Sequence, residues 1–180
     1  MFLSLSLAVG IVASITFFTD RLDGSLMMES KQFLGGDLKY ESDTPLDESS
    51  FPIGDYSYAS IYEFGSVLGS SRKFQLASVK SVSPPYPLIG EFEILKKYDE
   101  RVLETNPPKS GKVWLDTRLA NLLEVTIDDV INIGEKDFSI SGIILAESDR
   151  GAGSFAFAPK AVMNSSCLLY TSDAADDVAS

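Results

Sequence analysis

The sequence of 180 residues contains no histidine and a single cysteine, Cys167. Without histidine, the chain lacks the most frequent general base, the most frequent metal ligand and the usual pH switch near neutrality. A single cysteine excludes an intrachain disulfide and any zinc or redox site built on a Cys-x-x-Cys pair. These absences argue against most hydrolytic, metal-dependent and redox functions.

Positive charge is also scarce, because 15 Lys and Arg face 26 Asp and Glu and the net charge is −11. So acidic a chain is a poor partner for nucleic acid, and its soluble part is a poor partner for anionic membrane surfaces. The glycine-containing segments 65–71 and 151–153 lack the lysine and hydroxyl pair of a phosphate-binding loop. We therefore expect no nucleic-acid partner, no cofactor and no ATP hydrolysis by this chain alone.

Carboxylate pairs are the remaining candidates for catalysis or metal binding, and they are Asp128 with Asp129, Glu91 with Glu93, and Asp47 with Glu48. Nothing in their spacing fixes two carboxyl groups across a substrate cleft. Residues 41–48 lack the spacing and the glycine of an EF-hand loop. We predict that these acids are solvated, that the chain has no catalytic residue and no metal site, and that it is not an enzyme.

The first eighteen residues, Met1 to Phe18, carry no charged side chain and no proline, and Thr19, Asp20 and Arg21 end this run abruptly. As a helix the run would be about 27 Å long, close to the hydrocarbon thickness of a bilayer. No Lys or Arg precedes Arg21, and the apolar run is longer than that of a signal peptide. The pattern favours a membrane anchor over a cleaved signal or a buried soluble helix.

Helical periodicity continues beyond Phe18, because Leu22, Leu26 and Phe33 recur at helical spacing. Gly35 and Gly36 then supply a stop signal. We predict one helix of some thirty residues that leaves the membrane and continues as a stalk over residues 19–36. The alternative is a membrane helix that ends at Thr19 and a separate surface helix.

From Asp37 the pattern changes to short strands and turns. The predicted strands are 37–42, 56–68 with a bulge at Gly65, 73–82, 91–95, 112–115, 130–133, 138–145 and 154–158. Turns at 69–72 and 134–137 predict two hairpins. A short helix capped by Asp116 or Thr117 runs to Leu123, a last helix opens at Pro159, and 96–111 is a loop. This is an α+β pattern rich in hairpins, not an alternating βαβ one.

The loop Asp149-Arg150-Gly151 is the most pointed candidate for a partner-docking site. Arg150 offers bidentate hydrogen bonds to a partner. The competing interpretation is a simple Asp–Arg turn closed by glycines.

The segment from Cys167 to Asp177 resembles a translated transposase adapter used in sequencing-library preparation. We therefore predict that residues 167–180 are a non-native tail and that the native chain continues past Ser166. A natural acidic C-terminus is the alternative.

Three blocks of the sequence together resemble one family. They are Phe17–Leu22 with Phe33–Leu38, then Leu76–Val82 with Tyr86–Gly90, and finally Val113–Leu119, Asp129–Gly134, Phe138–Ile143, Asp149–Gly151 and Ala158–Pro159. These blocks are similar to the FtsX/MacB-like ABC transporter permeases, over essentially residues 1–166.

The resemblance implies a first transmembrane helix at 1–18, a stalk helix at 19–36 and a MacB-like extracytoplasmic core domain at 37–166, with further membrane helices beyond this sequence. It implies the bacterial plasma membrane as location. The implied partners are the lipid bilayer, a separate cytoplasmic ATPase, and a second copy or a second permease subunit. Phe18, Thr19, Asp20 and Arg21 would then form the junction between membrane and domain.

The function that the resemblance implies is coupling of the ATPase to the outer domain, for export or for handling of lipids and other amphiphiles. It carries over no catalytic residue. Two other classes stay open: a membrane-anchored binding or scaffold domain without transport, and a secreted hydrolase released by cleavage near Ala13 and Ser14.

Overall fold

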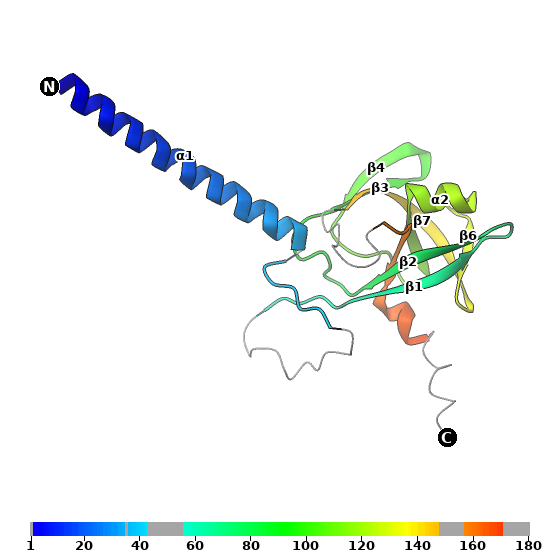
Figure 1. Cartoon of the computed structure of the whole chain (residues 1–180). Helices are drawn as coiled ribbons and strands as arrows, with labels where there is room; N and C mark the ends of the chain where they lie inside the picture. The colour runs from blue at the N-terminus through cyan, green and yellow to red at the C-terminus, as the bar shows by residue number, and fades with distance from the viewer. Residues whose placement is uncertain (1, 35, 43–55, 148–156, 171–180) are drawn as a thin grey trace.

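The computed structural model describes residues 2–34, 36–42, 56–147 and 157–170. Figure 1 shows a long helix, α1, that extends away from a curved sheet. The elements in chain order are α1 (Phe2–Leu34), β1 (Ile61–Gly69), β2 (Phe74–Val82), β3 (Phe92–Lys96), η2 (Lys97–Asp99), β4 (Glu100–Glu104), β5 (Lys112–Asp116), α2 (Thr117–Leu123), β6 (Val130–Ile133), β7 (Lys136–Glu147), β8 (Lys160–Asn164) and η3 (Ser165–Tyr170).

α1 is one continuous helix of 33 residues. It passes Thr19 without a break and ends at Leu34, just before the two glycines, so the prediction of a single helix is confirmed. Its division into a membrane span over 1–18 and a stalk over 19–36 stays a prediction. Within the residues that the structure describes, no helix combines the length and the apolar character of a membrane span.

The eight strands form one mixed sheet in the order β4-β3-β7-β5-β8-β2-β1-β6, and β6 also pairs with β7. Six strands therefore close a ring, which runs β7-β5-β8-β2-β1-β6 and back to β7. The length of β7 makes this possible, because one of its edges pairs first with β6 and then with β3 while the other pairs with β5. The β2–β8 and β5–β7 pairs are parallel and the others antiparallel. The α+β class is thus confirmed.

Two hydrophobic clusters lie on opposite faces of this sheet, because successive side chains of a strand alternate between faces. The larger cluster receives side chains from all six ring strands, from α2 and from η3. The smaller one lies on the other face, where the rings of Phe92 and Trp114 meet edge to face at 5.4 Å. Each fully buried Leu or Ile contributes about 1.5–3 kcal/mol relative to an exposed one, so these clusters dominate the stability of the domain.

α2 begins where the sequence predicts. The backbone N–H of Leu119 donates to Oδ1 of Asp116 at 2.5 Å, which satisfies one of the free donors of the first turn. The helix ends at Leu123, and the next residue, Glu124, caps it with a left-handed φ of 55°. It buries Leu119, Ala120 and Leu123 against the larger cluster.

Both predicted hairpins are confirmed. β1 and β2 pair in unbroken register from Ile61 with Val82 to Gly69 with Phe74, and β6 pairs with β7 across the turn after Ile133. A Cβ on Gly69 would lie 2.8 Å from the ring of Phe74, so this position has room only for glycine while the ring stays where it is. The bulge predicted at Gly65 is wrong, because Gly65 pairs regularly with Ser78.

The predictions for residues 37–42 and 96–111 are wrong. Residues 37–42 form no strand. Leu38 and Tyr40 both stay exposed, so the alternation of apolar and polar residues in this segment does not correspond to one buried and one exposed face. The predicted loop 96–111 contains β4, which pairs with β3. The sequence conceals this hairpin because its turn places Tyr98 and Asp99 at φ of 67° and 59°, where glycine or asparagine is the usual signal.

The helix predicted from Pro159 is also wrong. Residues 160–164 form β8 in the middle of the sheet, between β5 and β2. Ala161 and Met163 enter the larger cluster and Val162 the smaller one. An apolar run this short is compatible with the periodicity of a helix and with that of a strand. It forms a strand because it pairs with β2 on one side and with β5 on the other. Of the predicted strand 154–158, the described residues Phe157 and Ala158 form a turn and the others lie outside the described residues.

The first residues of the predicted non-native tail pack on the domain. Cys167 lies in η3, is 5% exposed and belongs to the larger cluster. The backbone N–H of Gly111 donates to its sulfur at 3.4 Å. Residues 171–180 lie outside the described residues, and the non-native origin of the tail stays a prediction.

Candidate functional site

The apolar half of α1 is exposed around its circumference in this chain. Val9, Val12, Ile15, Phe17 and Phe18 are each between 61% and 67% exposed. In water so much uncovered apolar surface on one helix is unfavourable, because a stable surface helix buries one apolar face. This half of α1 therefore requires an apolar environment or a partner.

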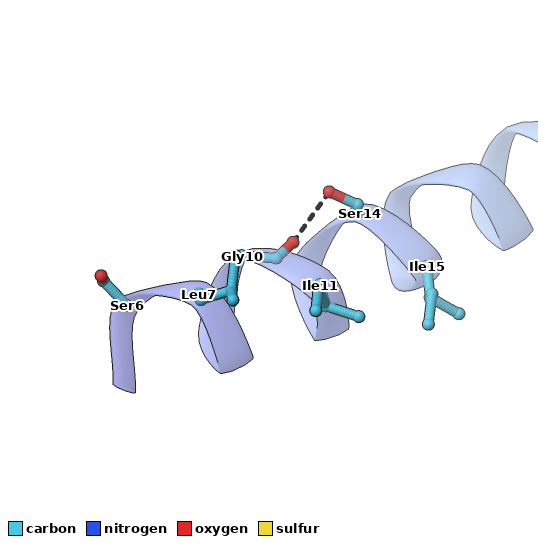
Figure 2. Close-up of a pocket in the computed structure, with 6 residues that line it drawn as sticks. All are labelled: Ser6, Leu7, Gly10, Ile11, Ser14 and Ile15. Carbon is cyan, nitrogen blue, oxygen red and sulfur yellow. Dashed lines mark hydrogen bonds between the residues drawn. The ribbon is translucent and has the colours of Figure 1, made fainter. Parts of the chain in front are cut away.

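Three hydroxyl groups in this half donate hydrogen bonds within the helix. Ser14 donates to the carbonyl of Gly10 at 2.8 Å, and Thr16 and Thr19 donate to the carbonyls four residues before them at 3.0 Å. Figure 2 shows the Ser14 bond beside the shallow hollow that Ser6, Gly10 and Ser14 line together with Leu7, Ile11 and Ile15. Such internal bonds remove the cost of placing a hydroxyl in an apolar medium.

The predicted junction lies on regular helix at the point where charge begins. Phe18, Thr19, Asp20 and Arg21 are all exposed. The guanidinium carbon of Arg21 lies 5.3 Å from the centroid of the Phe17 ring, one turn earlier. This is a cation–π contact on the helix surface.

A buried polar cluster, formed by residues of β2, β7 and β8 together with Tyr86, lies on the sheet face opposite α2. The ammonium of Lys80 donates to Oε1 of Glu147 at 2.6 Å and to the phenol oxygen of Tyr86 at 2.5 Å. Lys160 donates to the other carboxylate oxygen of Glu147 at 3.0 Å. The Lys80 and Glu147 side chains are only 3% and 9% exposed. Nothing in the sequence pattern signalled this cluster.

The predicted docking residues Asp149, Arg150 and Gly151 lie outside the described residues. The described residues that flank this segment are firmly held. Glu147, before it, is bound by the two lysines, and the carbonyl of Phe157, after it, accepts a hydrogen bond from Arg118 at 2.8 Å.

Three of the paired acids, Asp128, Asp129 and Glu93, form ion pairs or hydrogen bonds with other residues of the domain. Asp128 pairs with Lys97 at 2.5 Å, and Asp129 accepts hydrogen bonds from the backbone and hydroxyl of Thr126. Glu93 lies 3.4 Å from Arg101, Glu91 is exposed, and the Asp47–Glu48 pair lies outside the described residues. Across the described part of the chain, no group of three or more Cys, Asp or Glu converges as metal ligands would.

An exposed apolar surface on the β1–β2 hairpin escaped the sequence reasoning. Val67 pairs with Leu76 and Gly69 with Phe74, so these residues share one face of the ladder, and Gly69 also pairs with Asn132. Val130 lies two residues from Asn132 and so on the same face. Val67, Phe74, Leu76 and Val130, which we call the hairpin patch, are 54–77% exposed. Apolar residues on both faces of the hairpin were the available signal.

No family model matches the chain. A curated relative is 29% identical over 171 residues, the uncharacterized ABC transporter permease YbbP of Escherichia coli (strain K12). The match covers 91% of this chain and 20% of the relative, so the chain spans about a fifth of the length of the curated protein it matches.

Two solved structures are similar over part of the chain. The periplasmic region of MacB from Actinobacillus actinomycetemcomitans has a TM-score of 0.44 and 13% identity, covering 62% of this chain and 49% of that one. The extracellular domain of the ABC-type transporter YknZ from Gram-positive bacteria has a TM-score of 0.47 and 9% identity, covering 63% and 56%. The resemblance to ABC transporter permeases, predicted from three blocks of the sequence, is confirmed by the Escherichia coli relative.

Proposed function

We propose that the chain is part of the permease subunit of an ABC transporter in a bacterial plasma membrane. In this proposal α1 supplies the first transmembrane helix and the sheet supplies an extracytoplasmic domain. The observation that carries it is the continuity of α1, which runs from an uncharged half into a charged half without a break. The similarity to an ABC transporter permease supports the same assignment.

The proposed mechanism is transmission of movement. A stiff helix that joins bilayer and domain moves as a rigid body, so tilt or rotation in the membrane is passed to the sheet. In this mechanism a separate cytoplasmic ATPase supplies the energy, a partner that the similarity to an ABC transporter permease supports. The outer domain then acts on cargo, which the resemblance suggests is a lipid or another amphiphile, without catalysis of its own. Asp149, Arg150 and Gly151 are proposed docking residues, and a second copy or a second permease subunit completes the assembly.

Insertion of two glycines after Thr19 tests this mechanism. In the permease reconstituted with its ATPase, spin labels at the exposed positions Ser71 and Asn106 report distances across the outer domain. We expect these distances to change with the nucleotide state in the parent protein and to stop changing in the glycine variant. An insertion of two alanines at the same site is the matched control, because it keeps the helix stiff. Distances that still follow the nucleotide state in the glycine variant would overturn the mechanism.

A membrane-anchored binding domain without transport is the second candidate, and the hairpin patch favours it. Exposed contiguous apolar residues often mark a protein-binding surface. Figure 1 shows the β1–β2 tip on the far side of the domain from the start of α1, where a partner has access. The genomic sequence past the codon for Ser166 separates the two candidates. Further hydrophobic segments and a neighbouring gene with Walker motifs favour the permease.

A further inference from the structure

We propose that Phe17, Phe18 and Arg21 form a binding site for the phosphate of a phospholipid headgroup, which fixes the depth and rotation of α1 in the bilayer. This inference rests on the proposed function, in which α1 crosses the membrane. The two rings would lie at the boundary between acyl chains and headgroups, and the guanidinium would bind the phosphate.

The geometry of the helix brings the three side chains together. At 100° per residue, Arg21 lies about 40° from Phe17 and about 60° from Phe18 around the helix axis, and so between them. The guanidinium carbon is 5.3 Å from the Phe17 ring centroid, and both rings are about two-thirds exposed, at 64% and 67%. The guanidinium therefore contacts the ring of Phe17 and lies on the same side of the helix as the exposed ring of Phe18. Apolar rings beside a long cationic side chain suit the boundary between acyl chains and headgroups.

The guanidinium is available for an anion. In the described part of the chain, no carboxylate lies within ion-pair distance of Arg21. Asp20 and Asp23 lie about 100° and about 160° away around the helix, so they face away from the site. An arginine in this position offers a planar fork of donors that matches two phosphate oxygens.

The position along α1 selects a lipid as the source of that phosphate. Arg21 is the first cation after nineteen residues with uncharged side chains, and the hydroxyl of Thr19 is satisfied by the Ile15 carbonyl at 3.0 Å. A long cationic side chain at the end of an apolar helix reaches to the headgroup layer while its stem stays among apolar groups. The anchor would thus define the point from which the stalk transmits movement.

Solid-state NMR tests the contact directly. The full chain, with arginine labelled at ¹³Cζ, is placed in vesicles of phosphatidylethanolamine and phosphatidylglycerol in phosphate-free buffer, and dephasing by lipid ³¹P is measured. We expect dephasing in the parent chain, its loss in R21Q, and its retention in R72Q. The R72Q variant is the matched control because Arg72 is also an exposed cation but lies in the turn between β1 and β2. Absence of dephasing in the parent, or its persistence in R21Q, would overturn the proposal.

A depth measurement separates this proposal from the proposed function. In a C167S background, spin labels at Ser14 and Ser25 report accessibility to oxygen in the bilayer and to a water-soluble nickel chelate. We expect Ser14 to be accessible to oxygen, Ser25 to be accessible to nickel, and R21Q but not R72Q to shift both depths. An unchanged depth in R21Q contradicts the anchor and leaves the membrane span intact. Nickel access at Ser14 contradicts the membrane span itself and the anchor with it.

Discussion

The carboxylate of Glu147 binds Lys80 through one oxygen, at 2.6 Å, and Lys160 through the other, at 3.0 Å. The Lys80 side chain is 3% exposed, that of Glu147 is 9% exposed and that of Lys160 is 16% exposed. One carboxylate therefore compensates two ammonium groups on neighbouring strands. It does so at the last residue of β7, directly before the segment that contains Asp149, Arg150 and Gly151.

Replacing Glu147 by glutamine should therefore be severe. The amide keeps the shape but removes the negative charge that Glu147 places between Lys80 and Lys160, and breaking a buried ion pair costs about 3–5 kcal/mol. Chemical denaturation of the full chain in micelles measures this loss. Glu104→Gln is the matched control, because its partner Lys96 is more exposed and such pairs contribute about 0–1 kcal/mol. Equal losses in the two variants would show that the Glu147 cluster is not a buried electrostatic centre.

Gly142 lies directly beneath the packing of the smaller hydrophobic cluster. A Cβ at this position would collide with Cγ2 of Ile94 and lie 3.2 Å from Cδ1 of Trp114. We expect Gly142→Ala to cost about 1–3 kcal/mol through overpacking. The near-ultraviolet circular dichroism of Trp114, the only tryptophan, should change with it.

Gly24→Ala is the control for this substitution. No heavy atom lies within 4 Å of a Cβ at Gly24, and alanine is favoured over glycine in a helix by about 1 kcal/mol. This variant should be at least as stable as the parent and should leave the Trp114 signal unchanged. If alanine is tolerated equally at both positions, the close packing inferred at Gly142 is wrong.

Local signals in the sequence predicted local structure well. Asp116 correctly predicted the start of α2, because an aspartate at this position caps the first turn. The turn signal at residues 69–72 correctly predicted the first hairpin. The same local reasoning missed β4, whose turn uses Tyr98 and Asp99 in left-handed conformation. It also missed β8, because an isolated run of five residues takes its conformation from the strands on either side.

The candidate site shows the same limit. A junction at Phe18–Arg21 could be proposed from the sequence because hydropathy and charge change there within a few residues. The Lys80 cluster was not, since Lys80 lies in an ordinary strand pattern and its carboxylate partner is 67 positions away. The strand order of the sheet, in which β2, β8, β5 and β7 follow one another, brings these charges together, and this order cannot be read from the local sequence.

The salt bridge between Lys73 and Glu124 should make a part of the stability pH-dependent. The pKa of Glu124 lies below its ordinary value, chiefly because Lys73 donates a hydrogen bond to it at 2.7 Å, and also because the charges of Lys73 and Arg72 favour the ionised form. A carboxyl group whose pKa is lowered by folding stabilises the native state fully above its unfolded-state pKa. That contribution is lost as the pH falls through the folded-state pKa.

We therefore expect Lys73→Gln to raise the pKa of Glu124 toward its ordinary value, as measured by ¹³C NMR titration of the carboxyl group. The stability difference between the variant and the parent should be present at neutral pH and disappear in acid. Because both side chains are about half exposed, about 1 M salt should also reduce the shift. Lys97→Gln, which removes a similar charge next to Asp128, should leave the titration of Glu124 unchanged. If Glu124 titrates identically in Lys73→Gln and in the parent, the bridge does not form in solution and the hairpin tip is not tied to the end of α2 by charge.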